Sequence, residues 1–205
     1  MKKIILASNS ESVAFWKMDM FGLDKNKIKW AYITTAGNDV PDNTYLVVNK
    51  KRLDDLGWDY EEMDITDKNE DEVYEMLKDK DAILMQGGNT FYLLKQALAC
   101  NFSKVLDRLL AEGKIYVGTS AGSYIMCPNI EMTDWNGTSR FNRHDMTNLT
   151  ALAKVPFQVF CHFNRYTDDE KAKIKEQAKK SKYKVYFLED GQAIQIEEEK
   201  ITFIK

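Results

Sequence analysis

Short apolar segments alternate with segments of helical periodicity along this chain, and that alternation constrains the fold more than any other feature. We expect strands at residues 3–8, 28–35, 58–65, 82–86, 114–118, 156–163 and 183–188. Between them we expect helices at residues 11–21, 42–56, 70–77, 90–99, 103–110, 121–126 and 167–180. Strands that alternate with helices form right-handed β-α-β units. The chain is therefore expected to adopt a three-layer α/β fold, with a mainly parallel sheet and helices on both faces.

Two regions depart from this alternation. Residues 192–197 and 200–204 predict a β-hairpin near the end of the sequence. Residues 128–149 are polar and weakly periodic, which predicts a long loop with little regular structure. Long loops in compact domains are often functional. No repeat or linker divides the sequence, so residues 1–205 are interpreted as one domain.

Positive and negative charges are mixed along the chain. There are 29 Lys and Arg against 32 Asp and Glu, for a formal net charge of −3. A nucleic-acid-binding surface needs clustered positive charge, so no nucleic-acid partner is expected. The lysines of residues 171–180 share a predicted helix with several acidic residues, which is typical of a solvated helix face.

The cysteines and the N-terminal residues indicate the cellular compartment of the protein. Cys100, Cys127 and Cys161 are odd in number and form no C-x-x-C pair, which indicates reduced thiols. The apolar run at residues 4–7 is too short for a signal-peptide core, and no segment approaches the length of a membrane span. We therefore expect a cytoplasmic protein with no membrane partner.

A G-x-S-x-G pattern, Gly118-Thr119-Ser120-Ala121-Gly122, follows one predicted strand and precedes a predicted helix. In this setting a sharp turn presents the serine hydroxyl at the edge of the sheet, and the small neighbours allow close approach. Ser120 is therefore the candidate nucleophile, and the N–H of Ala121 can help to bind an oxyanion. The alternative is a glycine-rich turn without catalytic function, which could hold a phosphate.

A second glycine-rich turn, Gln86-Gly87-Gly88-Asn89-Thr90, also joins a predicted strand to a predicted helix. The glycine pair lets backbone N–H groups face a cleft, as a second oxyanion donor requires. Asn89 and Thr90 are candidates to bind substrate. Their alternative role is to cap the following helix, and the two roles can coexist. The turn matches neither a Walker A loop nor G-x-G-x-x-G.

Only two histidines can serve as the base that Ser120 needs near neutral pH. His162 lies at the carboxyl end of a predicted strand, where the ligands of α/β sheets bind, and is preferred. His144 lies in the polar loop at 128–149 and is the alternative. Two histidines this far apart give no obvious zinc site, so no metal is expected.

A carboxylate should hold the imidazole in the correct tautomer. Asp190 and Glu189 follow the last predicted parallel strand, and Asp134 follows the nucleophile helix. We rank Asp190 first, Asp134 second and Glu189 third. Each of them could instead be an ordinary turn residue, since Asp-Gly is a common turn dipeptide.

Five segments of the chain resemble, in order, the peptidase E (aspartyl dipeptidase) family of serine peptidases: residues 86–91, 118–122, 127–130, 156–163 and 189–194. The resemblance implies an α/β fold related to class I glutamine amidotransferases. It implies Ser120 and His162 as nucleophile and base, and oxyanion donors from Gly88 and Ala121.

The same resemblance concerns the third member of the triad. The family has a glutamate near the last of these segments, which Asp190 would replace here with a shorter side chain. The family also has an aspartate with an assigned charge-relay role close to the position of Asp134. Cys161 precedes His162 where the family usually has proline.

The implied activity is removal of an N-terminal aspartate from small peptides by a Ser-His-acid acyl-enzyme mechanism, without a cofactor. Arg140 and Arg143 of the polar loop could bind a substrate carboxylate, or could be merely exposed. One rival function is hydrolysis of isoaspartyl substrates of the cyanophycinase type. The other is a catalytically weak module that binds a small ligand. The sequence leaves a homodimer open.

Overall fold

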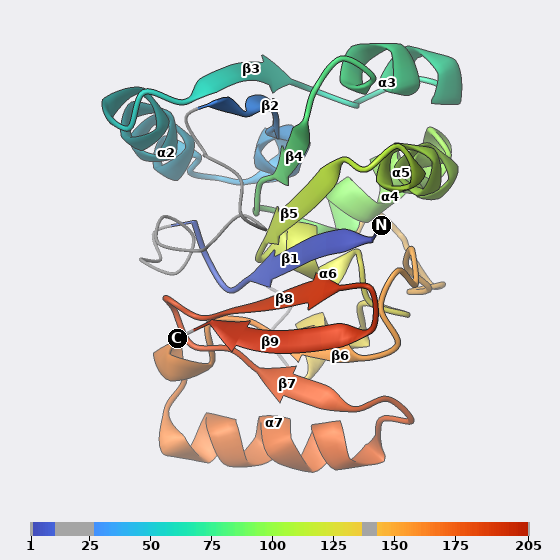
Figure 1. Cartoon of the computed structure of the whole chain (residues 1–205). Helices are drawn as coiled ribbons and strands as arrows, with labels where there is room; N and C mark the ends of the chain where they lie inside the picture. Colours follow the sequence, from blue (N-terminus) through green and yellow to red (C-terminus); the bar gives the residue numbers. More distant parts are fainter. Residues whose placement is uncertain (1, 11–26, 137–142, 205) are drawn as a thin grey trace.

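The central element is a sheet of seven strands in the order β3-β2-β4-β5-β1-β8-β9 (Figure 1). The structure, a computed structural model, describes residues 2–10, 27–136 and 143–204. The parallel strands are β1 (Lys3–Ala7), β2 (Lys29–Ile33), β3 (Asp59–Met63), β4 (Ala82–Met85) and β5 (Ile115–Thr119). The hairpin of β8 (Ala193–Glu197) and β9 (Lys200–Ile204) completes one edge and is antiparallel. The mainly parallel sheet and the hairpin were both predicted from the sequence.

Six α-helices lie in the described part of the chain. They are α2 (Thr44–Asp55), α3 (Glu70–Leu77), α4 (Thr90–Ala99), α5 (Phe102–Ala111), α6 (Ala121–Tyr124) and α7 (Asp168–Lys180). The helix expected at residues 11–21 lies outside the described residues. Capping boxes begin α3 and α7, because the N-cap side chain and the third helical residue exchange hydrogen bonds with each other's backbone N–H. None of the helices described combines the length and apolar character needed to cross a membrane.

Alternate residues of the strands face opposite sides of the sheet, and each side has its own apolar core. In β1, Ile4 and Leu6 belong to the larger core, whereas Ile5 and Ala7 belong to the smaller one. The larger core includes apolar residues of α3, α4, α5 and α6. The smaller core is covered by α2 through Leu53. Helices therefore cover both faces, as a three-layer fold requires.

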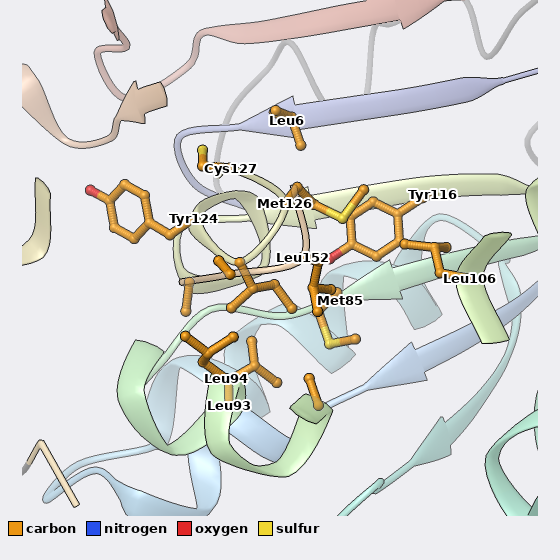
Figure 2. Close-up of a cluster of buried hydrophobic side chains, with 14 of the residues drawn as sticks. Leu6, Met85, Leu93, Leu94, Leu106, Tyr116, Tyr124, Met126, Cys127 and Leu152 are labelled. Carbon is orange, nitrogen blue, oxygen red and sulfur yellow. The ribbon is translucent and has the colours of Figure 1, made fainter. Parts of the chain in front are cut away.

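Figure 2 shows part of the larger core around β5 and α6. Leu6, Met85 and Leu94 are all buried there. The ring of Tyr116 is also buried, and its hydroxyl donates to the carbonyl of Gly122 in α6 at 2.8 Å. This bond connects β5 to α6. The turn between them is therefore stabilised from its buried side.

The segments expected as strands at residues 156–163 and 183–188 do not join the main sheet. Their regular parts are shorter, β6 (Gln158–Phe160) and β7 (Val185–Phe187), and they pair with each other as a separate two-stranded parallel sheet. The reason is that β8 pairs with the whole of β1, from residue 3 to residue 7. This side of β1 therefore has no free edge for another strand. Figure 1 shows β7 between β9, the edge strand of the main sheet, and α7.

The segment expected to be an irregular loop, residues 128–149, contains a short 3-10 turn at Glu131–Asp134. Asn129 also forms an isolated antiparallel bridge with Thr150. Residues 137–142 lie outside the described part of the chain. The described residues of this segment therefore agree with a loop that has little regular structure.

Candidate active site

Ser120 lies in a strained turn between β5 and α6. Its backbone has φ +49° and ψ −108°, a conformation that L residues rarely adopt. The two glycines of the pattern allow the turn to pack. A Cβ at Gly118 would lie 2.4 Å from the carbonyl oxygen of Gly122, and one at Gly122 would lie 2.2 Å from that of Met85. The G-x-S-x-G pattern thus forms the sharp strand-to-helix turn that it predicted.

Ser120, His162 and Asp190 form a continuous hydrogen-bonded chain. Ser120 Oγ lies 3.0 Å from His162 Nε2, and His162 Nδ1 lies 2.7 Å from Asp190 Oδ1. The order of the three groups is the one found in serine hydrolases, in which a carboxylate orients the base. His162 follows β6 and Asp190 follows β7, so the small two-stranded sheet brings the imidazole and the carboxylate together.

The backbone around His162 is fixed by its neighbours. Its N–H donates to Ser8 Oγ at 2.8 Å, and the N–H of Phe163 donates to Leu188 O at 3.0 Å. His162 has φ +60°, in the left-handed region, which turns the chain sharply after the strand. The backbone that carries the imidazole is therefore held by the residues that directly follow β1 and β7.

Arg165 is a contact of Asp190 that sequence reasoning missed. Its Nε donates to Asp190 Oδ2 at 2.5 Å, while His162 contacts the other carboxylate oxygen. Burial alone would raise the pKa of Asp190, but the hydrogen bonds and charges of His162 and Arg165 outweigh it and lower the pKa to about 2. Asp190 thus stays ionised at neutral pH. The only signal in the sequence was the position of Arg165, one turn after His162.

Asp134, the second-ranked carboxylate, lies in a different set of contacts. Its Oδ2 pairs with Arg143 at 2.8 Å, and the guanidinium of Arg143 lies 5.3 Å from the centre of the Phe91 ring. Of the three carboxylates considered, Asp190 is the one that hydrogen-bonds His162. Arg143 is engaged with Asp134, and Arg140 lies outside the described residues.

His144, the alternative base, contacts Asp39 rather than Ser120. Its Nε2 lies 2.7 Å from Asp39 Oδ2. The same oxygen accepts a hydrogen bond from the side-chain amide of Asn89 at 2.5 Å. This cluster joins the polar loop to the start of α4.

Cys161, next to His162, is not a competing nucleophile. Its side chain has no exposed area, and burial raises the pKa of its thiol well above the usual range. A buried, protonated thiol is a poor nucleophile. Ser120 is therefore the group beside the imidazole that can react.

The backbone N–H groups of Gly88 and Ala121, the expected oxyanion donors, have no acceptor in the described part of the chain. The N–H groups on either side of Gly88 are used, because Gly87 donates to Thr119 Oγ1 and Asn89 donates to Ala36 O. Gly88 has φ +150°, and a Cβ there would lie 2.2 Å from Ala36 O, so only glycine fits.

The serine opens onto a cavity of about 520 Å³, a size suited to a small ligand. Its lining includes Ser120, His162, Gly88, Thr90 and Arg165. Of the two residues expected to bind substrate, Thr90 lines the cavity. Asn89 does not, because its side chain is buried and accepts from the N–H groups of residues 91 and 92 as the N-cap of α4.

The sequence of this chain matches a known protein family. The sequence model of peptidase family S51 matches residues 4–204, nearly the whole chain. The chain belongs to peptidase family S51. The family that the five segments implied is thereby confirmed, and so is the three-layer α/β fold expected from the alternation of strands and helices.

Relatives of the S51 chain carry peptidase names. This chain is 34% identical over 133 residues to an uncharacterized peptidase of Listeria monocytogenes. It is 32% identical over 145 residues to peptidase E of Shewanella baltica. These alignments span 65% and 70% of this chain. The chain covers only 64% and 57% of the lengths of those two relatives.

Two solved structures support the fold. A crystal structure from Listeria monocytogenes EGD-e, of a protein with a provisional peptidase E name, matches with a TM-score of 0.84 and 28% identity. That match covers 100% of this chain and 98% of the other. A peptidase from an acI-B1 Actinobacterium matches with a TM-score of 0.64 over 96% of this chain and 83% of that one. At 16% identity this second likeness concerns the fold alone.

Proposed function

We propose that this chain is a serine peptidase that hydrolyses small peptides, namely dipeptides with an N-terminal aspartate. The observation that carries the proposal is the hydrogen-bonded chain of Ser120, His162 and Asp190 at the edge of a cavity. Membership of a peptidase family and the peptidase E names of relatives support the same function.

In the proposed reaction, His162 Nε2 accepts the proton of Ser120 as the serine oxygen attacks the peptide carbonyl. Nδ1–H of the same ring donates to Asp190, which holds the required tautomer and stabilises the imidazolium. The ionised state of Asp190 suits this role, because its pKa is lowered to about 2.

The carbonyl oxygen becomes negatively charged in the tetrahedral intermediate. The N–H groups of Gly88 and Ala121 are the proposed donors to it, and the start of α6 adds its positive dipole end. Collapse of the intermediate expels the amine, which takes the proton from His162. Water activated by the same imidazole then releases the acyl group from Ser120.

Two features support a small acidic substrate. The cavity of about 520 Å³ is in the size range that holds small ligands. Arg165 lines it and leaves half of its side chain exposed while its Nε contacts Asp190. A guanidinium binds carboxylates through several N–H groups at once. We therefore propose that Arg165 attracts the aspartate side chain of the substrate.

Ser120→Ala tests the proposal most directly. The variant should lose hydrolysis of Asp-X dipeptides by at least about 10³-fold, because it lacks the hydroxyl that is proposed to form the acyl-enzyme. Circular dichroism should remain that of the wild type. Full activity in this variant would mean that Ser120 is not the nucleophile.

A substrate panel separates the rival functions. Asp-X dipeptides, isoaspartyl dipeptides and simple esters should be compared by kcat/KM, together with labelling of Ser120 by a fluorophosphonate. Faster turnover of the isoaspartyl set would favour a cyanophycinase-type substrate. Tight binding of a small ligand without labelling or turnover would favour the binding module.

A further inference from the structure

Three of the four backbone N–H groups from residue 86 to residue 89 donate to acceptors elsewhere in the fold. Gln86 N–H donates to Ile33 O at 2.9 Å, Gly87 N–H donates to Thr119 Oγ1 at 3.1 Å, and Asn89 N–H donates to Ala36 O at 2.8 Å. The N–H of Gly88 is left over in the described part of the chain. Gly88 and Ser120 line the same cavity, so this N–H belongs to a residue beside the candidate nucleophile.

The carbonyl of Gly87 has its own anchor, the hydroxyl of Tyr45. Tyr45 lies in the first turn of α2, 42 residues earlier in the sequence, and its Oη donates to Gly87 O at 2.9 Å. Burial, and less strongly the nearby Asp42 carboxylate, raise the pKa of Tyr45 to about 12. The phenol therefore keeps its proton at neutral pH and remains a donor.

Two glycines make room for this hydroxyl. A Cβ at Gly88 would lie 2.9 Å from Tyr45 Oη, and one at Gly37 would lie 3.3 Å from it. The first distance is shorter than real Cβ atoms show, and the second is tighter than most. The phenol thus lies in a slot that closes if either position carries a side chain, beside the cavity that it lines.

The carbonyl of Gly87 and the N–H of Gly88 belong to one peptide unit. That unit is planar, and in a trans peptide the two groups point in opposite directions. A hydrogen bond that holds the carbonyl therefore also holds the direction of the N–H. We propose that Tyr45 is a positioning residue that aims the Gly88 N–H at the developing oxyanion; this rests on the proposed function.

Loss of the Tyr45 hydroxyl should therefore weaken stabilisation of the charged intermediate and leave the binding of the uncharged substrate carbonyl unchanged. Glycine at φ +150° has no side chain to restrain its backbone, so loss of the Tyr45 bond lets the Gly87–Gly88 peptide rotate. An oxyanion donor acts through preorganised geometry, and removing one such donor costs about 10²- to 10³-fold in kcat. A donor that is loosened rather than removed should cost about 10- to 100-fold.

Tyr45→Phe is the test, with Tyr60→Phe as its matched control. Tyr60 also donates its hydroxyl to an oxygen, Asp54 Oδ1 at 2.8 Å, but it lies outside the lining of the cavity. Tyr45→Phe should lower kcat on Asp-X dipeptides about 10- to 100-fold with KM within about twofold, because the substrate carbonyl is uncharged in the ground state. Tyr60→Phe should change neither constant.

Two further measurements isolate the oxyanion. The rate at which a fluorophosphonate labels Ser120 should fall in parallel with kcat, since its tetrahedral adduct needs the same donors. Inhibition by a peptide aldehyde should weaken by the same factor, while inhibition by free aspartate should not change. Replacing Tyr45 with 4-aminophenylalanine restores an N–H donor at this position and should recover most of the labelling rate.

The outcomes distinguish failure of the proposed peptidase function from failure of the positioning role of Tyr45. If the wild type is neither labelled nor active, the proposed function fails and this inference fails with it. If the wild type is labelled and Tyr45→Phe is labelled equally fast, only the positioning role is wrong. A rise in KM with unchanged kcat would also overturn it, because Tyr45 would then bind substrate directly.

Discussion

The two histidines of this chain each contact an aspartate at the same distance, although through different ring nitrogens. His162 Nδ1 lies 2.7 Å from Asp190, and His144 Nε2 lies 2.7 Å from Asp39. Burial does not separate them either, since the two imidazole side chains are 22% and 16% exposed. A close histidine–aspartate contact by itself is therefore no sign of catalysis.

The difference lies in the third partner. The free side of His162 meets Ser120 at 3.0 Å, in a strained turn that faces a cavity. His144 packs its ring 5.3 Å from that of Tyr92, and its aspartate also holds the side chain of Asn89. One pair is oriented toward the candidate nucleophile, whereas the other connects a loop to the N-cap of α4.

The largest expected effect separates the two histidines. His162→Gln removes the proposed base and should lower kcat/KM on Asp-X dipeptides by about 10³-fold or more. His144→Gln keeps a side-chain amide that can still bond Asp39, and activity should stay within about threefold. Steady-state kinetics on both purified variants measure the contrast. Equal losses would show that the loop contact matters as much as the triad.

The second effect separates the two aspartates. Asp190→Asn should reduce kcat by about 10²- to 10⁴-fold, because the imidazole loses the acceptor that fixes its tautomer. Asp39→Asn should mainly lower the free energy of unfolding, by about 1–2 kcal/mol, because its charge-assisted hydrogen bonds are weakened. Asp134→Asn is the comparison for kcat. A large loss there with a small one at Asp190 would reverse the assignment of the carboxylate.

The smallest effect concerns acid stability. The pKa of Asp190 is lowered to about 2 in the folded state and is about 3.9 in an unfolded chain. Its ionised form therefore stabilises the fold above pH ~4, and that contribution is lost as the pH falls toward ~2. The stability difference between wild type and Asp190→Asn should shrink across this range, by about 1 kcal/mol after solvent screening. Urea unfolding at pH 5 and pH 2.5 measures it, and a constant difference would contradict the lowered pKa.

Local patterns in the sequence predicted most of the elements. The helices at 70–77 and 90–99 have the predicted bounds, and the capping box at Thr167 begins α7 where expected. The glycines around Ser120 predicted a turn that only small residues can form. These features depend on neighbouring residues, on side-chain period and on backbone conformation, all of which a sequence carries directly.

Contacts between distant segments required the tertiary structure. Ser120 and His162 are 42 positions apart, and only the packing of β6 and β7 outside the main sheet sets the distance between His162 and Asp190. The contact of His162 with Asp190 rather than Asp134, the contact of Arg165 with Asp190 and the hydrogen bond from Tyr45 to Gly87 all arise in the same way. The sequence by itself determined the short list of candidate reactive groups and where the chain turns. The fold decided which of them meet, because a distance between remote residues depends on how whole layers pack and not on any local pattern.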